Sequence, residues 1–205
     1  MSDFLIYSGY LILLINLIFY SFSFFRKKNV NGLFVCYLAF SALMQYSMEI
    51  MYHLHMSNLF LSNVFIIGQL ILLGLFYNSL FALKSQKRFV GISLIVALLV
   101  LAVQFMMDWS QFLRFNLFAI ALTSLLIVVY ALIHFYNMLT ESKSYYYASI
   151  GVVFYLLAST VLYFIGNLTH NLSNEFKFLS WELNAFLIII YYFFILYEWK
   201  KSFSK

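Results

Sequence analysis

Long apolar runs separated by short polar stretches occupy almost the whole chain. A hydrocarbon core about 30 Å thick is crossed by roughly 20 apolar residues in a helix. The pattern therefore predicts an all-α polytopic membrane protein, with seven transmembrane helices in one bundle that forms a single domain over residues 1–205. The expected spans are 4–25, 30–54, 60–83, 89–107, 115–138, 145–168 and 179–197.

Composition supports this prediction, because 65% of the residues are hydrophobic and only 9% are charged. Soluble domains are closer to 45–50% apolar and about 25% charged. We expect no soluble effector domain, so the function should be performed within the bundle or through a partner. The chain has no proline and only 7 glycines, whereas transport helices commonly use these residues to open the backbone. We therefore expect continuous helices, which disfavours an alternating-access transporter.

The basic residues collect at alternate ends of the predicted spans. If the spans alternate in direction, ten of the 12 Lys and Arg residues fall on one side, and only Arg114 and Lys177 fall on the other. This asymmetry predicts an outside N-terminus and a cytoplasmic C-terminus, in a bacterial cytoplasmic (inner) membrane. We expect the basic residues to meet membrane lipids. They are spread over several helix ends, so we expect no nucleic-acid partner.

Two carboxylates fall within the predicted spans, Glu49 in the second and Glu182 in the seventh. A charge at bilayer depth costs roughly 2.5–3.5 kcal/mol, so such residues are candidates for function. Gln45, Glu49 and His53 recur every four residues and share one helix face. Because both carboxylates are expected near the outer ends of their spans, we predict that they line one outward-facing cavity.

The sixth span carries a second polar stripe of Tyr155, Ser159, Tyr163 and Asn167, and Asn184 follows in the seventh span. Such residues are expected to hydrogen-bond to neighbouring helices or to a ligand. The predicted ligand-binding residues are Glu49, Glu182, Gln45, His53, Tyr163, Asn167 and Asn184.

His53 and His170, together with Glu49, are candidate ligands for a metal ion, the only cofactor that the sequence indicates. Imidazole and carboxylate groups suit zinc, and histidine, with an ordinary pKa of about 6.5, also suits proton sensing. The alternative is that Gln45 and Glu49 bond to other helices while His53 is an ordinary interfacial residue. The single cysteine, Cys36, is expected to pack as a small apolar residue in the second span.

The chain resembles small, uncharacterised seven-helix membrane proteins of Bacteroidota and sensory membrane modules that precede kinase or regulator domains. The resemblance rests on Gln45 and Glu49, on residues 76–78 (Phe-Tyr-Asn) with Lys84, and on the polar start of the last span. Intramembrane hydrolases of the ceramidase kind also use a histidine and an acidic residue early in the bundle. However, they need a His-x-x-x-His pair in the last helix, which this chain lacks.

The leading hypothesis is a non-enzymatic sensory or regulatory membrane module, without catalytic residues. It would bind a small ligand, an ion or a lipid headgroup in the outward-facing cavity and signal to a cytoplasmic or membrane partner. Three alternatives remain: an ion or small-solute transporter or channel that uses the same carboxylates, a metal-dependent intramembrane hydrolase, and an accessory membrane scaffold without a ligand.

Overall fold

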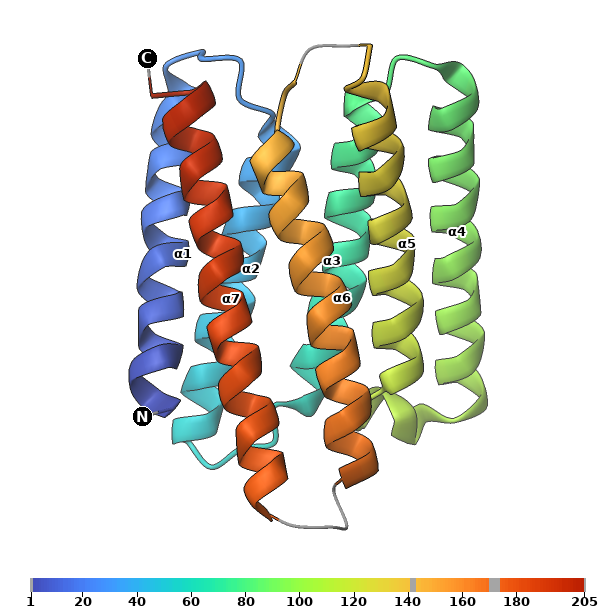
Figure 1. The fold of residues 1–205 in the computed structure, drawn as a ribbon. Helices are drawn as coiled ribbons and strands as arrows, with labels where there is room; N and C mark the ends of the chain where they lie inside the picture. The colour runs from blue at the N-terminus through green and yellow to red at the C-terminus, as the bar shows by residue number, and fades with distance from the viewer. Residues whose placement is uncertain (1, 141–142, 170–173, 205) are drawn as a thin grey trace. The chain divides into compact units, whose positions relative to one another are not determined.

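The computed structural model describes residues 2–140, 143–169 and 174–204, and all regular structure within these ranges is helical (Figure 1). Seven of the helices are long and apolar enough to cross a membrane, which indicates an integral membrane protein. The helices are α1 (Ser2–Phe25), α2 (Gly32–His53), α3 (Leu59–Leu80), α4 (Lys84–Met107), the 3-10 helix η1 (Trp109–Leu113), α5 (Leu117–Asn137), α6 (Tyr146–Thr169) and α7 (Asn174–Ser202).

The helices are continuous between these bounds, as the absence of proline predicts. Residues other than glycine with positive φ lie only in connections in the described ranges, at Lys27, His55 and Tyr145. The largest boundary differences are that α4 begins at Lys84 rather than at residue 89 and that α7 runs from Asn174 through Ser202 rather than over 179–197. Lys, Gln and Arg favour helix, and their long side chains keep the polar group in the headgroup region. The apolar runs therefore end before the helices do.

The chain divides into two compact units. The three-helix unit contains α1, α6 and α7, from Met1–Val30 and Thr140–Lys205; the four-helix unit contains α2 to α5 and η1, from Asn31–Leu139. Whether the two units form the predicted single seven-helix domain depends on how they pack together, so that domain stays a prediction.

In the three-helix unit, α7 packs against both α1 and α6. The buried Asn16 of α1 donates a hydrogen bond from Nδ2 to the carbonyl of Tyr192, at 2.9 Å, and the Tyr20 hydroxyl donates to the carbonyl of Ile195, at 3.1 Å. The residue further along α1 bonds to the residue further along α7, so the two helices run parallel.

Helix α6 runs antiparallel to α7 and approaches it closely at Gly151. A Cβ at this glycine would lie only 2.8 Å from the Cβ of Phe194, so a larger residue would force the helices apart. Further along the same interface, the rings of Tyr155 and Tyr191 stack at 5.1 Å. This close packing fixes the register of α6 against α7.

In the four-helix unit, α3 is the central helix and packs against α2, α4 and α5. Asn31 begins α2 by accepting a hydrogen bond from the backbone N–H of Leu33, and its Nδ2 donates to Ser79 Oγ at the end of α3, at 2.7 Å. Gln69 of α3 is buried and donates to the Tyr37 hydroxyl of α2, at 3.4 Å. The two helices therefore pack antiparallel.

Each unit has a basic end, which we define as the end where its predicted cytoplasmic Lys and Arg residues lie. In the four-helix unit this is the start of α2 and α4 and the end of α3 and α5. In the three-helix unit it is the end of α1 and α7 and the start of α6.

The prediction that Cys36 is packed is wrong, because its side chain is exposed. The buried face of α2 includes Phe34, Tyr37, Leu38 and Ser41, which recur with helical spacing. Cys36 lies on the opposite side of the helix from the centre of that face.

Candidate functional site

The predicted polar stripe of α2 lies at the end of the four-helix unit opposite its basic end. Its side chains become more exposed towards the helix end: Gln45 is 9% exposed, Glu49 21% and His53 61%. Glu49 Oε1 lies 3.0 Å from His53 Nε2, one turn further along the helix. The stripe therefore presents a titratable acid and base in direct contact, at a partly exposed position.

The connection after α2 separates His53 from His55. Helix α2 ends at His53, and His55 lies in the following turn with a φ of 56°. Asn58 holds this turn by donating from Nδ2 to the carbonyl of Met48, at 3.0 Å. His55 therefore leaves the helical face that carries Glu49 because the helix has already ended.

A cluster of amide side chains lies at the same end of the four-helix unit. Asn63 of α3 is 1% exposed and donates to the carbonyls of Phe112 and Arg114, each at 2.8 Å. Gln104 of α4 donates to Gln111 Oε1 in η1. These bonds hold the connection between α4 and α5 against α3. Nothing in the sequence indicated that Asn63 would bind a connection about fifty residues away.

Asp108 lies outside the helices, between α4 and η1, and its side chain is exposed. Its Oδ1 accepts a hydrogen bond from the backbone N–H of Ser110, at 3.0 Å, and so begins η1. Hydrogen bonding to Ser110, first of all through its side chain, lowers the pKa of the Asp108 carboxyl, and the nearby charge of Arg114 adds to this effect. Asp108 is thus a carboxylate that its surroundings keep ionised.

The predicted residues of the three-helix unit only partly come together. Asn184 is buried and donates from Nδ2 to the Tyr163 hydroxyl across the α6–α7 interface, at 3.1 Å. Asn167 is exposed, and Glu182 is half-buried without a hydrogen bond or ion pair to any other residue that the structure describes. This unit therefore joins two of its predicted ligand-binding residues in one contact.

The structure thus brings Glu49 to His53 in one unit and Asn184 to Tyr163 in the other. The predicted cavity shared by Glu49 and Glu182 would combine residues of both units, and it stays a prediction.

Two of the three predicted metal ligands, Glu49 and His53, lie in the described part of the chain. Structural and catalytic zinc sites use three or four protein ligands, and Glu49 and His53 supply two. Among the described residues, no group of three His, Cys, Asp or Glu side chains is placed to hold a metal ion. The third predicted ligand, His170, lies outside the described residues.

Comparison of the chain with protein families, with curated proteins and with solved structures finds no match. The inference of function therefore rests on the residues themselves.

The sequence pattern missed Glu198 of α7, which lies one residue beyond the predicted end of the seventh span. Its side chain is 1% exposed. Its Oε2 accepts the backbone N–H of Tyr147 in the first turn of α6, and its Oε1 accepts the Ser202 hydroxyl, each at 2.7 Å. The sequence shows that Glu198 and Ser202 are four residues apart and so can meet on one helix, but it does not show the contact of Glu198 with Tyr147.

Further contacts surround Glu198 at the basic end of the three-helix unit. Trp199 Nε1 donates to Ser23 Oγ of α1, at 2.9 Å, and Lys28 Nζ donates to the carbonyl of Phe203, at 3.2 Å. Together these bonds connect the ends of α1, α6 and α7. We therefore assign Glu198 a structural role.

Proposed function

We propose that this protein is a non-enzymatic sensory or regulatory membrane module, which binds a small ligand, an ion or a lipid headgroup at the end opposite its basic residues. In this proposal the N-terminus is outside and the C-terminus cytoplasmic, in a bacterial inner membrane, and a cytoplasmic or membrane partner receives the signal. The observation that carries the proposal is the partly exposed contact between Glu49 and His53, 3.0 Å apart.

This pair can respond to a ligand because it joins a carboxylate to an imidazole and neither side chain is fully buried. A cation, or a ligand with a hydrogen-bond donor, can replace His53 as the partner of Glu49. Replacement would change the packing of α2 only if the ligand binds one arrangement of the helix better than another. Tyr37 of α2 bonds to Gln69 of the central helix α3. A change in the packing of α2 can therefore reach the other helices of the four-helix unit.

The continuous helices favour a module of this kind over a transporter with broken helices. A metal-dependent hydrolase would need a third metal ligand such as His170. A transporter or channel that uses Glu49 remains the main competitor, because both functions need an accessible carboxylate.

The proposal is tested by native mass spectrometry of the protein released from mild detergent, for the wild type and for Glu49→Gln. The matched control is Asp108→Asn, which removes a carboxylate at the same end of the four-helix unit. We expect an adduct, or an adduct with added Zn²⁺, in the wild type and in Asp108→Asn but not in Glu49→Gln. Glu182→Gln tests the predicted shared cavity by the same measurement.

Bare protein in all these samples, with Zn²⁺ present or absent, would contradict the proposal and favour a scaffold. Ion flux through reconstituted vesicles that is lost in Glu49→Gln and kept in Asp108→Asn would instead establish the transporter or channel. A binding module is expected to give no flux.

A further inference from the structure

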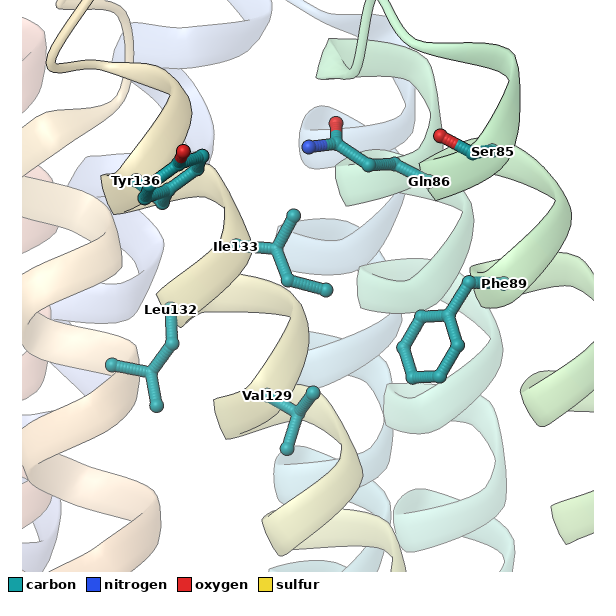
Figure 2. Close-up of a pocket in the computed structure, with 7 residues that line it drawn as sticks. All are labelled: Ser85, Gln86, Phe89, Val129, Leu132, Ile133 and Tyr136. Carbon is teal, nitrogen blue, oxygen red and sulfur yellow. The ribbon is translucent and has the colours of Figure 1, made fainter.

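A groove runs between α4 and α5 near the basic end of the four-helix unit. It has a volume of about 490 Å³, within the range of about 300–1,000 Å³ that is usual for small-molecule sites. Phe89 of α4 and Ile133 of α5 point towards each other across it (Figure 2). The lining residues are Ser85, Gln86 and Phe89 of α4, and Val129, Leu132, Ile133 and Tyr136 of α5.

Two polar cross-links hold α4 and α5 at either side of the groove. Gln86 and Asn137 exchange a pair of amide hydrogen bonds, each at 2.8 Å, and the hydroxyls of Ser93 and Tyr130 lie 2.8 Å apart. The two links are seven residues apart on both helices, which is about 10 Å along the axis. Over their whole length, α4 and α5 pack against each other less extensively than either packs against α3.

The groove is open to the surroundings of the unit, and its wall is largely apolar. Phe89 is 45% exposed and Leu132 53%. Both helices are long and apolar enough to span a membrane, so in a bilayer this wall would lie at the depth of the hydrocarbon. An occupant of the groove must therefore present an apolar chain to it.

Exposed basic side chains lie in the turns of α4 that begin the groove, beside its lining residues rather than among them. Lys84, Lys87 and Arg88 lie in the first two turns of α4, all exposed, and none forms an ion pair with any other described residue. The acidic residues of the four-helix unit, Glu49 and Asp108, both lie at the opposite end. An occupant of this end should therefore be anionic.

We propose that the groove binds an anionic phospholipid of the surrounding membrane. One acyl chain lies along Phe89 and Val129, and the phosphate lies at the level of Lys84, Lys87 and Arg88. The flexible stems of these side chains let their charged groups reach a headgroup beside the helix. A basic residue near an anionic lipid surface gains about fivefold in affinity, so three residues supply a preference of about one hundredfold over a neutral lipid.

This lipid site uses none of the residues assigned to ligand binding around Glu49 and lies at the other end of the same unit. The two proposals can therefore fail independently. An anionic lipid at this position would connect α4 and α5, which pack less extensively on each other than on α3, and it would make the stability of the four-helix unit dependent on membrane composition.

The first test measures lipid adducts by native mass spectrometry with dioleoylphosphatidylglycerol, dioleoylphosphatidylcholine or glycerol 3-phosphate. We expect the wild type to prefer phosphatidylglycerol, and the variant Lys84→Gln/Lys87→Gln/Arg88→Gln to lose that preference by about one hundredfold. The matched control removes three exposed cations of the other unit, as Lys27→Gln/Lys200→Gln/Lys201→Gln, and should keep it.

The second test fills the groove. Val129→Trp places an indole on its wall and should weaken binding of phosphatidylglycerol. Val103→Trp makes the same change at an exposed position of α4 outside the groove and should leave binding unchanged. A thermal unfolding midpoint equal to that of the wild type shows that each variant is folded.

A phosphatidylglycerol with a diazirine in its acyl chain gives a readout that needs no variant. In vesicles, irradiation should label peptides that contain Phe89 and residues 129–136. Labelling elsewhere only, equal binding of the two phospholipids, binding of glycerol 3-phosphate as strong as that of the lipid, or equal losses in the two triple variants would each overturn the proposal.

Discussion

Glu198 and Glu49 are both glutamates near the end of a long apolar helix, but their surroundings differ. Glu198 is 1% exposed and accepts two hydrogen bonds at 2.7 Å, one of them from the backbone of another helix. Glu49 is 21% exposed, and its His53 partner is a titratable, largely exposed side chain of the same helix. The first carboxyl group has fixed partners, whereas the second has a partner that a ligand can replace.

The contacts of Glu198 should contribute more to the free energy of unfolding than the contact between Glu49 and His53. A hydrogen bond to a charged group contributes about 1.5–3 kcal/mol, and a buried donor left without a partner costs a similar amount. The N-terminus of α6 also favours a negative charge beside Tyr147. An exposed pair at i and i+4 contributes only about 0.3–0.5 kcal/mol. In this protein, the buried Glu198 with two fixed partners is expected to stabilise the fold, and the partly exposed Glu49 is expected to be available for binding.

The largest effect should follow from Glu198→Ala. This substitution leaves the backbone N–H of Tyr147 without its acceptor and opens a cavity between α6 and α7. We expect the free energy of unfolding in detergent to fall by about 3 kcal/mol, measured by reversible denaturation of the purified protein.

Two milder variants show whether hydrogen bonding is responsible. Glu198→Gln keeps an oxygen for Tyr147 and lets the Ser202 hydroxyl donate to, or accept from, the amide, so it should cost less than half as much. Ser202→Ala removes one of the two bonds and should cost about 1 kcal/mol. Equal losses for Glu198→Ala and Glu198→Gln would mean that the charge, rather than the pair of bonds, stabilises this end of the unit.

The same contrast explains what the sequence could predict. Glu49 and His53 are four residues apart on one helix, so their contact follows from helical geometry alone. Tyr147 and Glu198 are 51 residues apart, and their contact depends on the register in which α6 packs against α7. The bond from Asn63 to the carbonyl of Phe112 depends in the same way on how a connection folds back.

Helix positions were predictable because they follow from runs of apolar residues. The seven helices lie where the runs are, and the errors lie at polar ends such as the start of α4 at Lys84. Exposure was less predictable: Cys36 is apolar and lies in the second span, yet it is exposed on α2. In a membrane, hydrophobicity does not distinguish the lipid-facing side of a helix from its packed side.

A smaller effect on stability is expected for Glu49→Gln, because the pair with His53 is partly exposed. The free energy of unfolding should change by less than about 0.5 kcal/mol, although the proposed ligand binding is lost. His53→Ala should be similarly mild. A loss as large as that of Glu198→Ala would place Glu49 among the structural carboxyl groups and remove the basis of the comparison.

The smallest effect on stability should come from substitution of Asp108, which is more exposed than Glu198 and Glu49. Hydrogen bonding to Ser110 lowers its pKa from the ordinary value of 3.8, so its ionised form stabilises the folded state above that pH. This contribution is lost as the pH falls through the folded-state pKa. Asp108→Asn keeps an oxygen for the backbone N–H of Ser110 but cannot ionise, so its unfolding midpoint should lie slightly below that of the wild type at neutral pH. The two midpoints should converge as the pH is lowered past 3.8. A constant difference across the titration would mean that Asp108 acts through the geometry of the turn and not through its charge.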